Sequence, residues 1–244
     1  HPVDANKEAL DERLEAMWKQ IALRFRDYDD RLLFAGTNEV NNDDANGAQP
    51  TEENYRVQNG FNQVFVNTVR ATGGRNHYRH LIVQAYNTDV AKAVAHFTMP
   101  LDIVQNRIFL ECHYYDPYDF TIMPNDENFK SQWGAAFAGG DVSATGQEGD
   151  IEATLSSLNV FINNNVPVII GEYGPTLRDQ LTGEALENHL KSRNDYIEYV
   201  VKTCVKNKLV PLYWDAGYTE KLFDRTTGQP HNAASIAAIM KGLN

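Results

Sequence analysis

The chain has 244 residues, of which 42% are hydrophobic and 23% are charged, and its formal net charge is −11. This is the composition of an ordinary globular protein, and no stretch reaches the roughly 20 apolar residues that a membrane-spanning helix needs. The negative charge argues against nucleic acid as a partner, because binding to phosphates depends on clustered lysines and arginines. Cys112 and Cys204 match no metal-binding or redox spacing, and we expect both to be inert buried thiols.

Five short apolar runs along the chain predict five strands. They are residues 32–37 (LLFAGT), 80–85 (HLIVQA), 107–112 (RIFLEC), 167–171 (PVIIG) and 209–214 (LVPLYW). Continuous rather than alternating apolar character is typical of parallel strands that are covered on both faces.

Helical stretches lie before and between these runs, at residues 7–26, 52–72, 151–164, 186–206 and 233–243. The first repeats apolar residues at spacings of three and four: Leu10, Leu14, Met17, Ile21 and Phe25. Alternation of strand and helix over residues 1–244 predicts a single α/β domain with a parallel sheet. The one long irregular stretch, residues 116–149, follows the third strand, and a loop of this length is usually functional.

The number of strands bears on the kind of α/β fold. A complete eight-fold barrel has about 250 residues, but this chain opens on a helix and offers five strands. Five parallel strands cannot close and would leave two unpaired edges. We therefore expect an incomplete (β/α)8 TIM barrel, of which the chain supplies the last five strand–helix units. The missing N-terminal part of the same barrel is then an expected partner.

Polar and aromatic residues follow the predicted strands directly, and active sites of β/α barrels lie at these ends. The residues are Asn38, Glu39, Tyr86, His113, Tyr115, Glu172 and Trp214. Two carboxylates at one barrel mouth suit glycoside hydrolysis, which needs one protonated carboxyl group and one ionised carboxylate. His113 and Tyr115 are two apart on an extended segment, so we expect both to point at the attacking carboxylate.

The ordered set of motifs resembles glycoside hydrolase family 5, the cellulase-type retaining enzymes. The set consists of Asn-Glu at 38–39, His-x-Tyr at 113–115, Gly-Glu-Tyr-Gly at 171–174 and Trp214. The segments WKQIA and FRDYDDRLLF also look like the helix that leads into the family's fourth strand. The resemblance runs from about residue 14 to the C-terminus and looks closest to the branch that acts on cellulose, xyloglucan and mixed-linkage glucan.

The resemblance implies a role for each matching residue. Glu39 matches the acid/base and Glu172 the nucleophile of the family, while Asn38, His113, Tyr115 and Trp214 match its substrate-site residues. Tyr86 stands at a strand end and is a further candidate for substrate binding. A retaining mechanism predicts carboxyl groups about 5–5.5 Å apart. It also predicts that Glu39 has the higher pKa of the pair.

Two departures from the family pattern stand out. Ala35 occupies a position where many members carry a second glutamate, and we expect this change to be mild. The family's second-strand arginine and third-strand histidine pair have no counterpart, so we expect the isolated chain to lack part of the family's site.

We therefore predict an endo-β-1,4-glucanase with a β-glucan as its partner, extracellular or periplasmic, and with no metal or organic cofactor. Three alternatives stay open. One is another β-1,4-glycanase, such as a mannanase or xylanase. The second is a metal-dependent barrel hydrolase with Glu39, His113 and Glu172 as ligands. The third is a carbohydrate-binding protein without activity. Trp133, in the long loop, fits a sugar platform and a hydrophobic anchor equally well.

Overall fold

The computed structural model describes residues 1–42, 49–125, 128–217 and 221–244. The strands follow the predicted apolar runs and are β1 (Phe34–Ala35), β2 (Leu81–Gln84), β3 (Ile108–Tyr114), β4 (Val168–Tyr173) and β5 (Val210–Pro211). They lie in one sheet in chain order, β1-β2-β3-β4-β5, and β1–β2, β2–β3 and β4–β5 pair in parallel. The predicted parallel sheet is therefore confirmed.

The chain divides into two compact units, which are described in turn. The first consists of residues 1–112 and 160–168, and the second of residues 113–159 and 169–244. Strand β3 begins in the first unit and ends in the second. The single domain expected over residues 1–244 stays a prediction.

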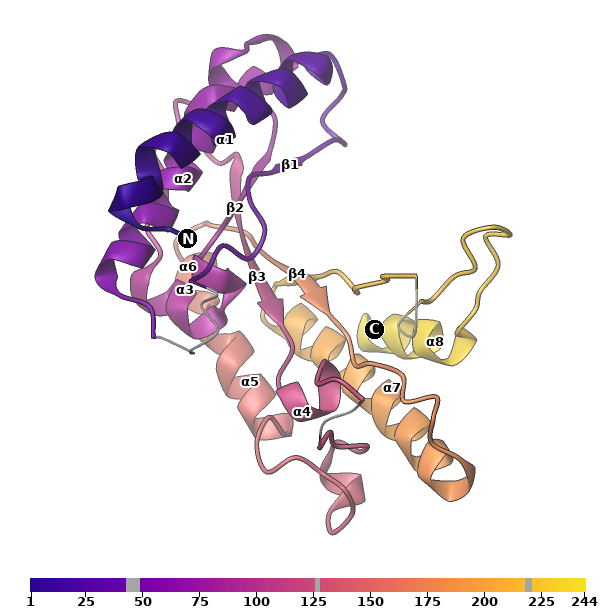
Figure 1. Cartoon of the computed structure of the whole chain (residues 1–244). Helices are drawn as coiled ribbons and strands as arrows, with labels where there is room; N and C mark the ends of the chain where they lie inside the picture. Colours follow the sequence, from indigo (N-terminus) through magenta and orange to yellow (C-terminus); the bar gives the residue numbers. More distant parts are fainter. Residues whose placement is uncertain (43–48, 126–127, 218–220) are drawn as a thin grey trace. The chain divides into compact units, whose positions relative to one another are not determined.

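The first unit packs two long helices against its strands. These are α1 (Asp4–Arg24) and α2 (Glu52–Ala71), which lie side by side (Figure 1). On α2 the buried residues recur every fourth position, at Val57, Phe61, Phe65 and Val69, so one stripe of the helix faces the core. Each such side chain stabilises the fold by about 1.5–3 kcal/mol through burial. Three shorter helices, η1 (Gly74–His77), η2 (Tyr86–Thr88) and α3 (Val90–His96), also belong to this unit, as does most of α6 (Asn159–Ile162).

The buried face of α1 follows the predicted stripe in part, because Leu14, Ile21 and Phe25 pack against the core. Its buried residues are Trp18 and Ala22, whereas Met17, part of the predicted stripe, is 48% exposed. The Trp18 ring lies 4.6 Å from the ring of Phe65 and 5.4 Å from that of Phe34. Since the largest side chain of the helix fills the space between α2 and the sheet, the helix turns that side inward, and Met17 faces solvent.

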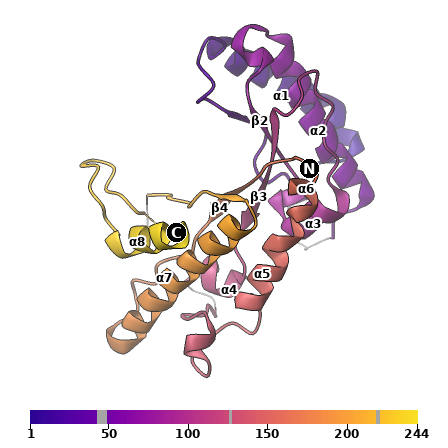
Figure 2. The ribbon, with the colours of Figure 1, turned by 180° about the vertical axis from the view of Figure 1, so that it is seen from behind.

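The second unit contains the long helix α7 (Gly183–Lys206), which packs against α5 (Glu148–Ser157) and α8 (Ala233–Gly242), as the view from behind also shows (Figure 2). The predicted helix 151–164 is instead split into α5 and the short α6 (Asn159–Ile162). Two short elements were not predicted in the long loop: α4 (Tyr118–Thr121) and η3 (Ala135–Phe137). Loop residues 126 and 127 lie outside the described residues. No helix of the described part is long and apolar enough to span a bilayer.

The long loop of residues 116–149 is anchored on α7 by Trp133. This side chain is 2% exposed, and its indole N–H donates to the Gly146 carbonyl at 2.7 Å. Its ring meets the Tyr196 ring of α7 edge-on, with centroids 5.2 Å apart. A ring buried in this way cannot serve as a platform for a sugar. Of the two readings of Trp133, the structure favours the hydrophobic anchor.

Both cysteines are buried free thiols, as expected. Burial raises the pKa of Cys204 to about 12 and that of Cys112 further still. Neither thiol is therefore available as a thiolate near neutral pH.

A buried histidine on α7 makes the same loop anchor sensitive to pH. The Nε2 atom of His189 accepts the backbone N–H of Arg178 at 3.0 Å, and its Nδ1 lies 2.8 Å from the Ser131 carbonyl. Nδ1 must therefore carry the proton, and the ring is neutral. Burial lowers the pKa of His189, and the charges of Arg193 and Arg178 lower it further.

We expect this histidine to make the protein less stable in mild acid. Its pKa in the folded state lies below the unfolded value of about 6.5. The contribution to stability is therefore fully present above that value and is lost as the pH falls towards the folded pKa. The measurement is the urea unfolding midpoint between about pH 7 and about pH 5. His189→Gln should flatten this dependence, and an equal slope in both proteins would contradict the assignment.

Candidate active site

The segment after β1 carries Asn38 and Glu39. Strand β1 is fixed by the Trp18 indole N–H, which donates to the Gly36 carbonyl at 2.8 Å. Gly36 lies so close to α2 that an added Cβ would meet the Phe65 ring at 2.7 Å. The chain then turns at Glu39, whose φ is 49°, while Asn38 is exposed. A positive φ is uncommon for a residue with a side chain, and such conformations cluster at functional sites.

Both backbone groups of Glu39 are held by side chains. Its N–H donates to Oε1 of Gln84 at 3.1 Å, and its carbonyl accepts the Asn41 side-chain N–H at 2.9 Å. Neither Gln84 nor Asn41 was predicted from the sequence. Gln84 could have been found from its place as the polar end of the apolar run HLIVQA.

Tyr86, predicted to bind substrate, lies in the first unit and is buried, with 6% of the residue exposed. Its hydroxyl accepts the Asn42 backbone N–H at 2.6 Å, and its ring meets that of Tyr55 edge-on. The side chain thus packs the loop that follows Glu39. A role in substrate binding stays a prediction.

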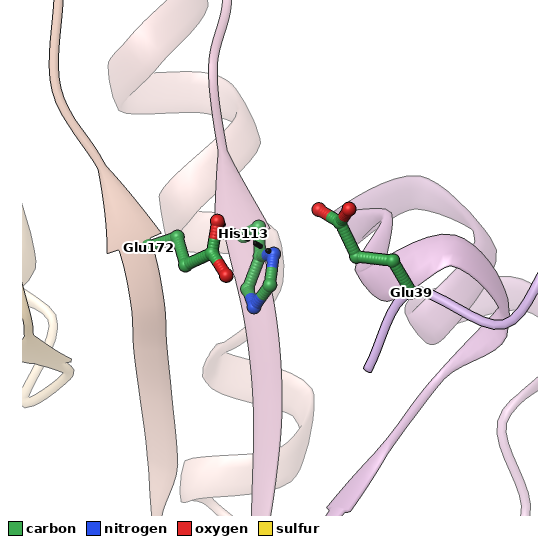
Figure 3. Close-up of side chains that lie close together, drawn as sticks. All are labelled: Glu39, His113 and Glu172. Carbon is green, nitrogen blue, oxygen red and sulfur yellow. Dashed lines mark ion pairs between the residues drawn. The ribbon is translucent and has the colours of Figure 1, made fainter. Parts of the chain in front are cut away.

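Glu172, near the end of β4, receives two side chains from the end of β3. The Tyr115 hydroxyl donates to Oε2 of Glu172 at 2.9 Å, and Nδ1 of His113 lies 3.6 Å from the same oxygen. Figure 3 shows the His113 ring beside this carboxylate. Glu39 is also labelled there, on the segment that follows β1. His113 and Tyr115 thus reach one oxygen from one face of the strand, as their spacing predicts. The carboxylate is only partly buried, with 13% of its side chain exposed.

Trp214 follows β5, and it is 46% exposed, as a sugar platform requires. Its backbone N–H donates to the Tyr173 carbonyl at 3.0 Å, which ties it to the residue after Glu172. The preceding Tyr213 accepts a hydrogen bond from the buried Arg193 at 2.6 Å.

Asp215, which also follows β5, has a structural role. Its carboxylate accepts the backbone N–H groups of Gly217 and Leu222, both at 2.9 Å. Burial alone would raise the pKa of Asp215, but these hydrogen bonds outweigh it and hold the pKa below its usual value. Asp215 therefore closes a turn and stays ionised.

Removing the Tyr115 hydroxyl should weaken Glu172 in the role of nucleophile predicted for it from the sequence. A hydrogen bond to a charged group is worth about 1.5–3 kcal/mol, so Tyr115→Phe should lower kcat/KM by about 10- to 150-fold. The acid limb of the pH–rate profile should also move to higher pH, because the ionised carboxylate loses a donor that stabilises it. Exposed Tyr78 offers the control variant Tyr78→Phe. An unchanged acid limb would show that the hydrogen bond does not act on the nucleophile.

The family model for cellulase, glycosyl hydrolase family 5, matches residues 1–220. The chain belongs to glycosyl hydrolase family 5. The resemblance predicted from the sequence motifs is thereby confirmed.

Named relatives and solved structures agree with this membership. Endoglucanase A of Paenibacillus barcinonensis is 34% identical over 260 residues, which cover 100% of this chain and 63% of that protein. The family 5 xyloglucanase from Paenibacillus pabuli superposes with a TM-score of 0.89 at 34% identity, over 98% of this chain and 69% of that one. A GH5-4 broad specificity endoglucanase from Bacteroides salanitronis gives 0.86 at 34% identity, over 98% and 64%. The predicted barrel class is confirmed.

Proposed function

We propose that the protein containing this family 5 chain is an endo-acting, retaining β-1,4-glucanase. The observation that carries the proposal is the Glu172 carboxylate, at the end of a parallel strand, with the Tyr115 hydroxyl and the His113 ring on one oxygen. These contacts orient the carboxylate, and the donated hydrogen bond stabilises its ionised form. Because the chain spans 63% of the length of endoglucanase A from Paenibacillus barcinonensis, the activity is proposed for the whole protein.

The reaction proceeds in two displacements. Glu172 attacks the anomeric carbon and the bond to the leaving oxygen breaks, while Glu39 gives that oxygen its proton. Glu39, now ionised, takes a proton from water, and the water oxygen displaces Glu172 from the anomeric carbon. The separation of about 5–5.5 Å between the two carboxyl groups stays a prediction of this mechanism. That Glu39 has a higher pKa than Glu172 also stays a prediction.

The substrate is a β-glucan: cellulose, xyloglucan or mixed-linkage glucan. Support comes from relatives named endoglucanase, from the xyloglucanase of Paenibacillus pabuli and from a family 5 lichenase of Caldicellulosiruptor. The half-exposed Trp214 ring offers a flat apolar face to a pyranose, and exposed Asn38 offers an amide to a sugar hydroxyl. A polymer of this size stays outside the cell, so we place the enzyme in the extracellular or periplasmic space of a bacterium.

The test is a panel of polysaccharides offered to the complete protein. Xyloglucan, carboxymethylcellulose and mixed-linkage glucan should release reducing ends, and the viscosity should fall early because cuts are internal. Faster release from mannan or xylan would replace the glucanase with another glycanase. Loss of activity on adding a chelator would favour a metal-dependent hydrolase, and binding without release of reducing ends a carbohydrate-binding protein.

A further inference from the structure

The pairing of β1 with β2 changes just before Glu39. Along the two strands, the Phe34 N–H donates to the His80 carbonyl at 3.3 Å and the Gly36 N–H to the Ile82 carbonyl at 3.0 Å. In a parallel ladder these bonds recur every second residue. The next acceptor in this register is the carbonyl of Gln84.

That carbonyl is occupied by two side chains from α2. Asn62 Nδ2 donates to it at 2.8 Å and Gln58 Nε2 at 3.2 Å. A carbonyl oxygen has two lone pairs, so both are filled and the ladder cannot continue through it. Gln58 and Asn62 are one helical turn apart on the same face of α2, and both are fully buried. The end of β2 is thus clamped by groups that have no access to solvent.

The side chain of Gln84, and not its carbonyl, accepts the next hydrogen bond from the segment that follows β1. Its Oε1 accepts the N–H of Glu39, at 3.1 Å, one residue beyond the ladder position. Only an oxygen can accept there, so the orientation of the amide is fixed. The segment leaves the sheet at this point, and Glu39 takes its φ of 49° with its carbonyl held by Asn41. Gln84 itself is 1% exposed.

We infer that Gln84 is a positioning residue for Glu39: where the α2 amides end the β1–β2 ladder, its side chain holds the backbone from which the acid/base side chain projects. The inference rests on the proposed role of Glu39. Gln84 does not touch the reacting atoms and acts only through the Glu39 backbone. A misplaced acid should slow the reactions that need proton donation and spare those that do not.

The test compares two substrates in the complete protein. A cello-oligosaccharide needs a proton on its leaving oxygen, whereas 2,4-dinitrophenyl β-cellobioside releases a stable anion without one. Gln84→Leu removes the acceptor at similar size. It should lower kcat/KM on the oligosaccharide by about 10- to 100-fold and on the dinitrophenyl substrate by less than about 3-fold. Gln20→Leu, on the exposed face of α1, is the matched control.

Gln84→Glu provides a second variant that keeps an acceptor oxygen. It should retain more oligosaccharide activity than Gln84→Leu. The alkaline limb of its pH–rate profile should move to higher pH, because a nearby negative charge favours the protonated form of Glu39. This readout stays informative even where the leucine variant folds poorly.

The outcomes separate this inference from the proposed function. Equal losses on both substrates in Gln84→Leu, or no loss on either, overturn the positioning role, as does an unmoved alkaline limb in Gln84→Glu. Glu39→Gln serves as the reference and should show the same substrate dependence, only larger. If Glu39→Gln cleaves the oligosaccharide normally, the proposed function of Glu39 fails instead.

Discussion

Replacing Glu172 with glutamine is expected to reduce kcat/KM on a β-glucan by at least about 10⁴-fold. The amide keeps the size of the side chain and can still accept from the Tyr115 hydroxyl, which donates to the Glu172 carboxylate at 2.9 Å. It has no negative charge and cannot form the covalent glycosyl-enzyme, so the first displacement stops. The measurement is the release of reducing ends from xyloglucan and carboxymethylcellulose by the complete protein.

The control is Glu187→Gln, because Glu187 is an exposed glutamate on α7 in the same unit. Its activity should equal that of the wild type. Equal thermal unfolding of the three proteins would show that the loss arises in the chemistry. Activity of Glu172→Gln within about 10-fold of the wild type would end the assignment of a nucleophile, since loss of one group of a catalytic unit removes most of its effect.

Replacing Arg79 with methionine is expected to destabilise the protein by about 3–7 kcal/mol. This arginine precedes β2 and is 2% exposed. All five of its N–H groups find an acceptor, namely Asn76 Oδ1 and the carbonyls of Phe25, Tyr28, Asp29 and Leu32, at distances between 2.5 and 3.0 Å. It thereby joins the end of α1 to the start of β1, with its guanidinium 4.7 Å from the centre of the Phe34 ring.

The size of the effect follows from what the variant leaves behind. Methionine fills the same stem but offers no donor, so five acceptors lose their partner. Four of these hydrogen bonds are only partly buried, and each lost bond costs about 0.5–1.5 kcal/mol net. Urea unfolding of the complete protein measures the change as a shift in midpoint with an unchanged slope. Arg75→Met, at an exposed position of η1, is the control. A shift no larger than in that control would show that these carbonyls find water.

The sequence determined the main features of the fold because they depend on local pattern. Each of the five apolar runs contains or overlaps a strand, and the long helices begin within about four residues of the predicted positions. The family followed from the order of short motifs around Glu39, His113, Glu172 and Trp214, each of which stands at or just after the end of a strand. The spacing of His113 and Tyr115 further predicted that both reach the same side of β3.

Only the tertiary structure decided how the side chains are used, because that depends on neighbours distant in sequence. The spacing along α1 offered Met17 a place in the core, yet Trp18 fills the space against Phe65 instead. Trp133 became an anchor because α7, some 60 residues later, covers its ring. The two glutamates were found from sequence. Gln84, 45 residues away, holds the backbone of Glu39. This contact depends on the pairing of β1 with β2 and on the two α2 amides that end that pairing, so only the tertiary structure shows it.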